Sequence, residues 1–162
     1  MRQIMDKQKI DTLFDYSYGK LFWKVKKSRN INVGDEAGSS NNEGYKVVLI
    51  DRKQYKIHRL IFCMFYGYFP EFVDHIDGNP SNNDISNLRK CTKSQNQHNT
   101  KLHKNNKTGV HGLSLNARNG KWLVQLQVDK RKKRVGEFED FELAELVAIE
   151  ARNKYHGEFA RK

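Results

Sequence analysis

The stretch that most constrains the fold runs from residue 74 to residue 99 and reads DHIDGNPSNNDISNLRKCTKSQNQHN. An Asp-His pair opens it, and a loop rich in Gly, Pro and Asn follows, which are residues that favour turns. A strand-like segment from Leu88 to Thr92 and a polar stretch that carries Asn96 complete it. The order predicts a strand, a loop, a strand and a helix, which can bring Asp74, His75 and Asn96 together.

These residue types suit the hydrolysis of a phosphodiester. Such a site must hold a hard divalent cation through oxygen ligands and must remove a proton from water. A carboxylate and an amide oxygen can perform the first task, and a neutral imidazole can perform the second. We interpret Asn79, Asn82 and Asn83 as turn formers, and we leave His98 out of the site because a helix would turn it to another face than Asn96.

The same residues carry a resemblance to a known family. Asp74-His75, Asn87 and Asn96, with DGN and NN-x-x-x-NL between them, resemble the ββα-metal active site of HNH homing endonucleases of phages and mobile elements, in the variant that ends in Asn. The resemblance implies that His75 is the general base and that Asn87 orients it. It also implies that Asp74 and Asn96 bind one Mg²⁺ or Mn²⁺. No structural zinc is expected, because Cys63 and Cys91 lack the paired spacing of zinc ligands.

The charge of the chain points to a polyanionic partner. The 162 residues include 30 Lys+Arg against 19 Asp+Glu, which gives a formal net charge of +11. Between Ile85 and Val128 there is no acidic residue, a pattern that indicates contact with phosphates. Residues 100–109 are polar and read as a basic linker along DNA. The DNA-contacting candidates in this part are Arg89, Lys90, Lys93, Lys101, Lys104 and Lys107.

The segment before the motif reads as scaffolding. Residues 12–57 predict two β-hairpins, with turns at Tyr18-Gly19-Lys20 and Asp51-Arg52-Lys53. Residues 58–67 are apolar nearly all round, which predicts a buried helix that ends at Gly67. We interpret His58 as structural rather than as a metal ligand. With a core at 71–99, the nuclease domain is expected to span residues 1–99.

The segment from 110 to 162 has a pattern of its own. HGLSLN, KWLVQLQV and KRVGEF predict three strands, separated by the turn Asn119-Gly120 and by a basic turn that includes Lys130 and Arg131. A helix is expected from about Phe141 to His156, and Gly157 should end it. Three strands under one helix form two layers. The acidic residues gather on the helix, so the sheet should face DNA.

The order of Gly109-Val110, a tryptophan strand, VGEF, a helix with ELAE, and HGEFA resembles the Apetala-type DNA-binding domain of ethylene-response transcription factors. The resemblance implies that the sheet contacts DNA. Strand alternation sets Gln125 and Gln127 against the apolar set that includes Trp122, so we expect Trp122 in the core. The candidates for contact in this domain are Ser114, Asn116, Arg118, Lys121, Gln125, Gln127, Lys130 and Arg131.

The sequence thus predicts an α+β protein with a ββα-metal nuclease module, a small N-terminal sheet and a C-terminal three-stranded sheet packed on one helix. The expected function is metal-dependent cleavage of double-stranded DNA at a preferred site by a monomer. We expect a soluble, intracellular protein with no small-molecule substrate and no membrane partner, because no apolar run is long enough to span a bilayer. The alternatives are a catalytically silent, sequence-specific DNA-binding protein and a structural nucleic-acid protein.

Overall fold

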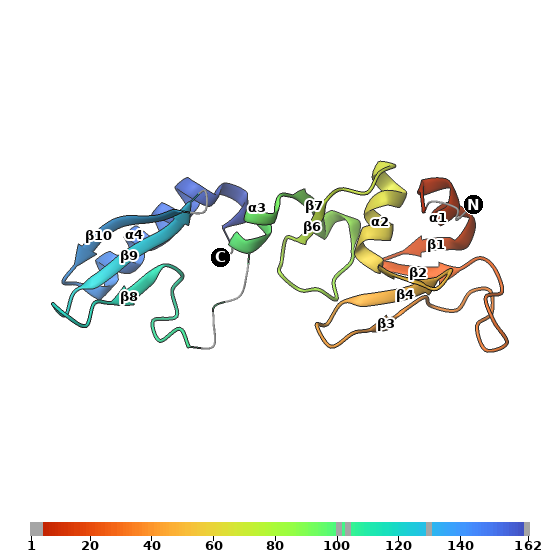
Figure 1. Ribbon diagram of the computed structural model, residues 1–162, viewed down its shortest axis with the longest axis horizontal. Helices are drawn as coiled ribbons and strands as arrows, with labels where there is room; N and C mark the ends of the chain where they lie inside the picture. Colours follow the sequence, from red (N-terminus) through yellow and green to blue (C-terminus); the bar gives the residue numbers. More distant parts are fainter. Residues whose placement is uncertain (1–4, 100–101, 103–104, 129–130, 161–162) are drawn as a thin grey trace. The chain divides into compact units, whose positions relative to one another are not determined.

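The computed structural model describes residues 5–99, 102, 105–128 and 131–160, without the side chain of His98. Within these ranges the chain is α+β, with four α-helices and several small antiparallel sheets (Figure 1). It divides into two compact units, Met1–Thr92 and Lys93–Lys162. The expected α+β class is therefore confirmed, whereas the ββα-metal arrangement stays a prediction. None of the described helices has the length and apolar character needed to span a bilayer.

The first unit begins with a short helix and a hairpin. Helix α1 (Lys7–Leu13), which the sequence reading did not anticipate, starts where the Asp6 side chain accepts a hydrogen bond from the backbone N–H of Lys9. Strands β1 (Phe14–Ser17) and β2 (Lys20–Trp23) then pair in antiparallel fashion. Their two-residue turn has positive φ at both positions, as hairpin turns that match the strand twist require.

A second sheet follows, with strands in the order β3 (Ser39–Ser40), β4 (Lys46–Ile50) and β5 (Lys53–Lys56). The turn between β4 and β5 again has positive φ, 50° at Asp51 and 62° at Arg52, although neither residue is a glycine. Strand β3 lies in a segment that reads from the sequence only as a polar loop. It pairs with β4 and adds a third strand to the expected hairpin.

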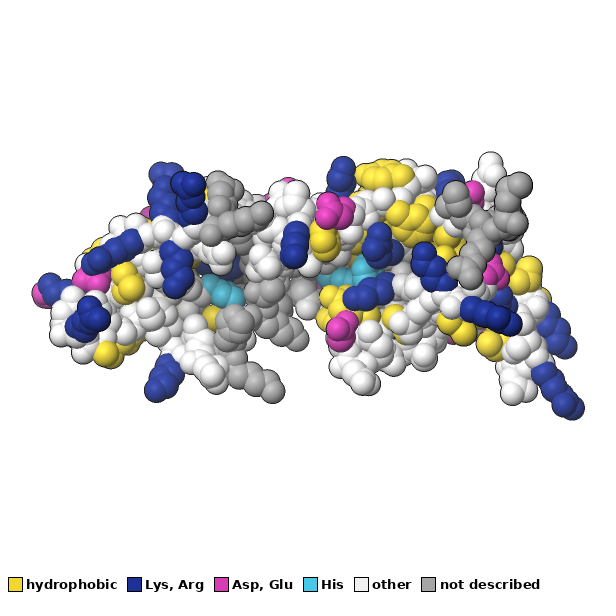
Figure 2. Space-filling model, viewed as in Figure 1, with side chains coloured by type: hydrophobic (Ala, Val, Ile, Leu, Met, Phe, Trp, Pro, Cys, Tyr) yellow, Lys and Arg dark blue, Asp and Glu magenta, His cyan; other side chains and the backbone are white. Residues whose placement is uncertain are grey.

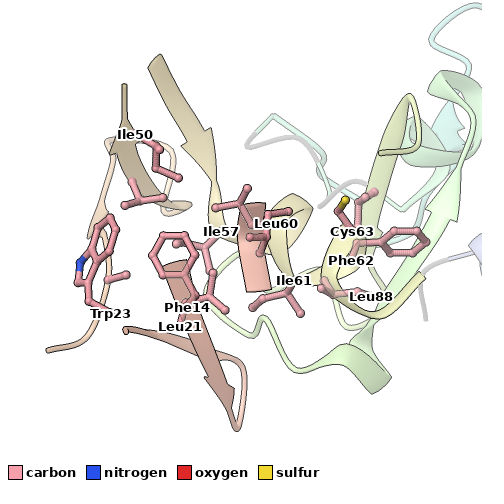
Figure 3. Close-up of a cluster of buried hydrophobic side chains, with 14 residues drawn as sticks. Phe14, Leu21, Trp23, Ile50, Ile57, Leu60, Ile61, Phe62, Cys63 and Leu88 are labelled. Carbon is pink, nitrogen blue, oxygen red and sulfur yellow. The ribbon is translucent and has the colours of Figure 1, made fainter. Parts of the chain in front are cut away.

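Helix α2 (Ile57–Tyr66) occupies the centre of the first core, where the sequence predicts a buried helix. Gly67 ends it in the left-handed conformation, with φ 80°. Figure 3 shows its side chains between the residues of β1, β2 and β4 on one side and Leu88 on the other. The helix residues that are buried in this core are Ile57, Leu60, Ile61, Phe62 and Cys63.

Two short strands carry the predicted catalytic pair. Strand β6 (Phe72–His75) pairs in antiparallel fashion with β7 (Leu88–Cys91), and the register sets His75 opposite Leu88. The 3-10 helix η1 (Ile85–Asn87) leads directly into β7. Because Val73 and Leu88 are part of the core around α2, the strand pair is anchored by apolar packing. Helix α3 (Lys93–His98) follows β7 and opens the second unit.

The second unit has a separate core. Strands β8 (Leu113–Leu115), β9 (Trp122–Val128) and β10 (Arg131–Phe138) form an antiparallel sheet in the order β10-β9-β8. Helix α4 (Phe141–His156) covers one face, and η2 (Gly157–Phe159) follows it. Leu113, Val124, Ala144 and Ala148 form the buried contact between the helix and the sheet. The expected three strands and helix are all present, although Asp129 and Lys130 lie outside the described residues.

Gly112 brings the loop before β8 against the backbone of β9. Gly112 has a positive φ of 76°. Its carbonyl accepts a hydrogen bond of 2.8 Å from the N–H of Gln125. A Cβ atom at this position would lie 2.5 Å from Leu126 Cδ2 and 2.9 Å from the carbonyl oxygen of Gln125. Only glycine allows this close approach.

Replacing Leu60 by Ala tests the central role of α2. Leu60 is 0% exposed, whereas Leu49 on β4 is 63% exposed. Leu60→Ala should lower the free energy of unfolding by about 2–5 kcal/mol, because it removes buried methyl groups and leaves a cavity. Leu49→Ala should change it by less than about 0.5 kcal/mol. Urea unfolding, followed by Trp23 fluorescence in a Trp122→Phe background, measures both; equal losses would contradict the assignment of the core.

Candidate active site and nucleic-acid interface

Asp74 lies near the end of β6 and is 5% exposed. Its carboxylate oxygen Oδ2 accepts two hydrogen bonds from Arg89 across the strand pair, 2.9 Å from Nε and 2.8 Å from Nη2. Burial of a carboxylate is costly unless a cation compensates it. Arg89, which the sequence suggested as a DNA contact, therefore serves first to neutralise Asp74.

His75, the last residue of β6, is also 5% exposed. Its Nε2 lies 3.0 Å from the amide oxygen Oδ1 of Asn83. Because an amide oxygen only accepts hydrogen bonds, Nε2 must carry the proton when the ring is neutral. The lone pair that can accept a proton from water is then on Nδ1.

Asn83 Oδ1 accepts a hydrogen bond from His75, whereas the bonds of the Asn87 side chain stay within the loop. The Asn87 amide instead donates 2.9 Å to Asp77 Oδ1 and 2.8 Å to the carbonyl of Asn82, and its oxygen accepts from the N–H of Asp77 at 3.0 Å. Asn87 thus closes the loop between the two strands. Asn83, which we interpreted as a turn former, is 2% exposed and contacts the predicted base.

Asp77 is the acceptor around which this loop is organised. Although partial burial acts to raise it, the pKa of Asp77 is lowered by hydrogen bonds from the Asn79 backbone and from the side chains of Asn82 and Asn87. The carboxylate is therefore ionised at neutral pH. Its bonds to Asn82 and Asn87 fix both ends of the segment that includes Asn83.

A second histidine lies behind the first. His58 of α2 is 4% exposed, and its ring centroid lies 4.9 Å from that of His75 in an edge-to-face arrangement. The Tyr45 ring packs at a tilt against both imidazoles, with centroid distances of 5.3 Å to His58 and 6.0 Å to His75. Burial, together with the charges on His75, Lys56 and Arg59, lowers the pKa of His58 to about 3. His58 is accordingly a neutral packing partner of His75 at physiological pH.

Asn96 lies on α3 in the second unit, so its convergence with Asp74 and His75 stays a prediction. Within the described residues, no group of three or more His, Cys, Asp or Glu side chains is arranged to hold a metal ion. The donor chemistry of the predicted pair nevertheless fits a hard ion. Mg²⁺ commonly takes one or two protein oxygens and completes its shell with water and phosphate oxygens.

The two cysteines are free thiols in buried positions. Cys63 belongs to the core around α2, as expected of a small apolar side chain. Burial raises the pKa of Cys91 to about 11, so this side chain is a protonated thiol at neutral pH. Neither residue has the exposed, acidic thiol that a nucleophile requires.

The predicted basic contacts fall in different environments. Lys90, Lys93 and Lys107 are exposed, and the Lys90 ammonium lies 5.7 Å from the centre of the Tyr68 ring. Lys101, Lys104 and Lys130 lie outside the described residues, as do residues 100, 103 and 129. In the hairpin between β8 and β9, Arg118 is exposed, but Asn116 donates 2.9 Å to Glu137 and Lys121 pairs with Glu139 at 3.0 Å. These two residues are thus engaged within the unit.

Burial along β9 defines the two faces of the second sheet. Val124 and Leu126 are buried beneath α4, and Trp122 packs edge-to-face against Phe141 at 4.9 Å. The expected position of Trp122 in the core is therefore confirmed. Gln125 and Gln127 alternate with these residues and point to the opposite face.

The register of β10 shows which of its basic residues lie on that open face. Directly paired residues of antiparallel strands share a face, and the pairs are Gln127 with Lys132 and Gln125 with Arg134. Arg131 pairs with Val128 and so lies on the side of α4. Ser114, paired with Leu123, does belong to the open face. Lys132 was missed because the sequence places the start of this strand at Lys133, whereas β10 begins at Arg131; a bulge separates Arg134 from Gly136.

Charge is divided unequally within the second unit. Helix α4 begins with Asp140 as its cap and carries Glu142, Glu145 and Glu150 on exposed or half-exposed positions. Strand β10 carries four successive exposed basic residues, Arg131 to Arg134. Figure 2 shows lysine and arginine side chains distributed over this unit with few acidic ones between them. The sheet therefore presents the more positive surface.

Comparisons with known proteins agree with part of this interpretation. Residues 55–98 match the model of the HNH endonuclease family, a range that includes α2, β6, β7 and α3. Protein 3.8 of Escherichia phage T7 is 35% identical over 97 residues, which cover 59% of this chain and 75% of the phage protein. No solved structure matches the chain significantly.

The buried His58 predicts a pH dependence of stability. Its pKa falls from 6.5 to about 3 on folding, so below pH 6.5 the unfolded chain binds a proton that the folded chain excludes. Acid therefore favours unfolding, and between pH 7 and pH 5 this group alone should lower the free energy of unfolding by about 2 kcal/mol. The loss should be absent in His58→Phe. Urea unfolding followed by Trp23 fluorescence measures it; an equal slope in both proteins would refute the assignment.

Proposed function

We propose that this chain, which belongs to the family of Protein 3.8 of Escherichia phage T7 and has an HNH endonuclease domain at residues 55–98, is a metal-dependent endonuclease of the homing type. It would cut double-stranded DNA at a preferred site. The observation that carries the proposal is the pair of buried residues at the end of β6, with Asp74 held by Arg89 and His75 held by Asn83. Both residues lie within the matched range.

His75 would act as the general base. With its Nε2 proton held by Asn83 Oδ1, the imidazole offers Nδ1 to a water molecule. Contact with the neutral His58 and with Tyr45 limits rotation of the ring. Asn83 is then a positioning residue, since it fixes the tautomer and the orientation of the base. Asn87 would contribute indirectly, because it secures the loop that holds Asn83.

Asp74 and Asn96 would hold one Mg²⁺ or Mn²⁺. When bound, such an ion neutralises charge on the phosphate and on the leaving oxygen. Arg89 contacts Oδ2 of Asp74, so the two cations would share one carboxylate. Arg89 therefore compensates the charge of the buried Asp74 carboxylate and fixes its orientation.

The second unit would supply affinity and site preference. Its support is a three-stranded sheet whose open face carries Gln125 and Gln127 beside Lys132, and also Arg134, which pairs with Glu137 at 2.9 Å. Glutamine can bond to adenine edges in the major groove, and basic residues contact phosphates. We propose that this unit is a DNA-binding domain of the Apetala type and that the protein acts on DNA as a monomer.

A cleavage assay tests the nuclease. Wild type should nick or linearise supercoiled plasmid, or cut the genomic DNA of its source, with Mg²⁺ and not with a chelator. His75→Ala should lose at least about a hundredfold in rate, because water is no longer deprotonated. Binding of DNA by this variant, measured by anisotropy with chelator, should be unchanged. Binding without cutting by wild type under any divalent metal would favour the catalytically silent DNA-binding protein instead.

Asn83 provides a graded control in the same assay. Asn83→Ala should lower kcat by roughly 10- to 100-fold with little change in KM, as the loss of a partner that orients a functional group commonly does. Asn79→Ala in the same loop should have a small effect, since the Asn79 side chain bonds only to the backbone of Ser81 among the described residues. An equal effect of the two substitutions would argue against a positioning role for Asn83.

The open face of the sheet can be tested through selectivity. Gln125→Ala should reduce the ratio of affinities for a mapped cleavage site and a scrambled duplex by about 5- to 150-fold, which corresponds to one lost bidentate base contact at 1–3 kcal/mol. Lys132→Gln should weaken binding to both duplexes alike. Gln54→Ala on β5, an exposed glutamine of the first unit, is the matched control. An unchanged ratio in Gln125→Ala would remove this residue from the interface.

A further inference from the structure

A cavity of about 570 Å³ lies within the second unit, beside the part of β9 that β8 does not cover. Strand β8 pairs with β9 only from Trp122 to Val124, and the cavity begins where that pairing ends. Its walls come from α3, from the loop before β8, from β9 and from the last turns of α4. The volume is in the range that ligand-binding cavities occupy.

The lining of this cavity is basic and rich in amides. The polar residues that line it include Lys93, Gln97, His111, Gln127, Arg152 and His156. None of the described lining residues carries a carboxylate. Figure 2 shows histidine side chains on the face of this unit, with lysine and arginine side chains around them. A cavity lined by Lys93 and Arg152, with no carboxylate among its described lining residues, attracts an anion.

Arg152 supplies a buried positive charge to this cavity. Arg152 is 8% exposed, and a guanidinium remains protonated even when buried. Burial and the nearby charge of Arg152 lower the pKa of His156, although its contact with the Gln127 carbonyl at 3.1 Å acts in the opposite direction. The His156 imidazole is therefore mostly neutral at pH 7, and Lys93 and Arg152 are the cations of the cavity.

The backbone of β9 adds a donor. The carbonyl of Gln127 faces His156, and the N–H and carbonyl of one strand residue point to the same side. The N–H of Gln127 is thus directed to the same edge as the cavity. Two residues earlier on the same edge, the N–H of Gln125 donates to the carbonyl of Gly112. The backbone of Gly112 therefore packs closely against β9 at this wall of the cavity.

From this geometry we infer that the cavity is a phosphate-binding site and that a phosphate of the DNA backbone fills it. Guanidinium, ammonium, amide and backbone N–H groups are the donors that bind phosphate oxygens. The inference rests on the proposed function for the source of the phosphate. Two of the lining residues, Lys93 and Gln97, lie on α3, the helix that also carries the predicted metal ligand Asn96. The proposed phosphate site and the predicted metal ligand therefore share one helix.

A matched pair of glutamine substitutions tests the site. Gln97→Glu places a carboxylate in the cavity wall with little change in shape, whereas Gln95→Glu makes the same change on the same helix outside the lining. Both are adjacent to Asn96, so binding is measured with chelator to exclude metal effects. For a DNA duplex, Gln97→Glu should reduce the slope of log affinity against log salt by about 1, while Gln95→Glu should leave the slope unchanged.

Removal of a cation provides a second pair. Lys93→Gln should reduce the slope as Gln97→Glu does, and Lys154→Gln, on an exposed position of α4, should not.

Equal slopes in wild type and Gln97→Glu, or equal losses in both glutamate variants, would overturn the inference. Inorganic phosphate titrated by calorimetry distinguishes the source: binding that Gln97→Glu abolishes, with an unchanged DNA slope, would overturn the assignment to DNA. Because cleavage is assayed separately, failure of this site leaves the nuclease proposal intact.

Discussion

The burial of α2 is the constraint on which the first unit depends. Five of its residues lie in one core, and β2, β4, β5, β6 and η1 all pack against this helix. A helix that is apolar nearly all round can be stable only when other elements cover it on every side. The same helix places His58 against His75. Packing and the orientation of the predicted base therefore come from a single element.

Burial of the polar side chains Asp74 and His75 lowers the stability of the folded chain but fixes their orientation. Asp74 and His75 are each 5% exposed, so their desolvation must be compensated by Arg89 and by Asn83. Removing one partner of such a pair is more costly than removing both, because a buried polar group is left without compensation. The loop that holds Asn83 is in turn fixed by Asp77 and Asn87. Each polar contact in this region supports the next one.

The sequence was informative where a local rule applied. The turns, the glycine that ends α2 and the span of α4 follow from the chemistry of a few adjacent residues. The sequence was less informative about contacts between residues that are far apart along the chain. Several asparagines of one loop have the same turn preference, so the choice of Asn83 over Asn87 as the partner of His75 depends on the folded loop. The pairing of Asp74 with Arg89 and the bulge in β10 likewise require the register of paired strands.

The uneven charge of the second unit has a consequence for the encounter that precedes binding. Acidic residues follow α4 on one side of the sheet, and basic residues crowd β10 and the adjacent hairpin. In the field of a polyanion such a unit experiences a torque, which turns the helix outward before any contact forms. Fewer collisions then occur in unproductive orientations, and the association rate constant should be the kinetic quantity most sensitive to ionic strength.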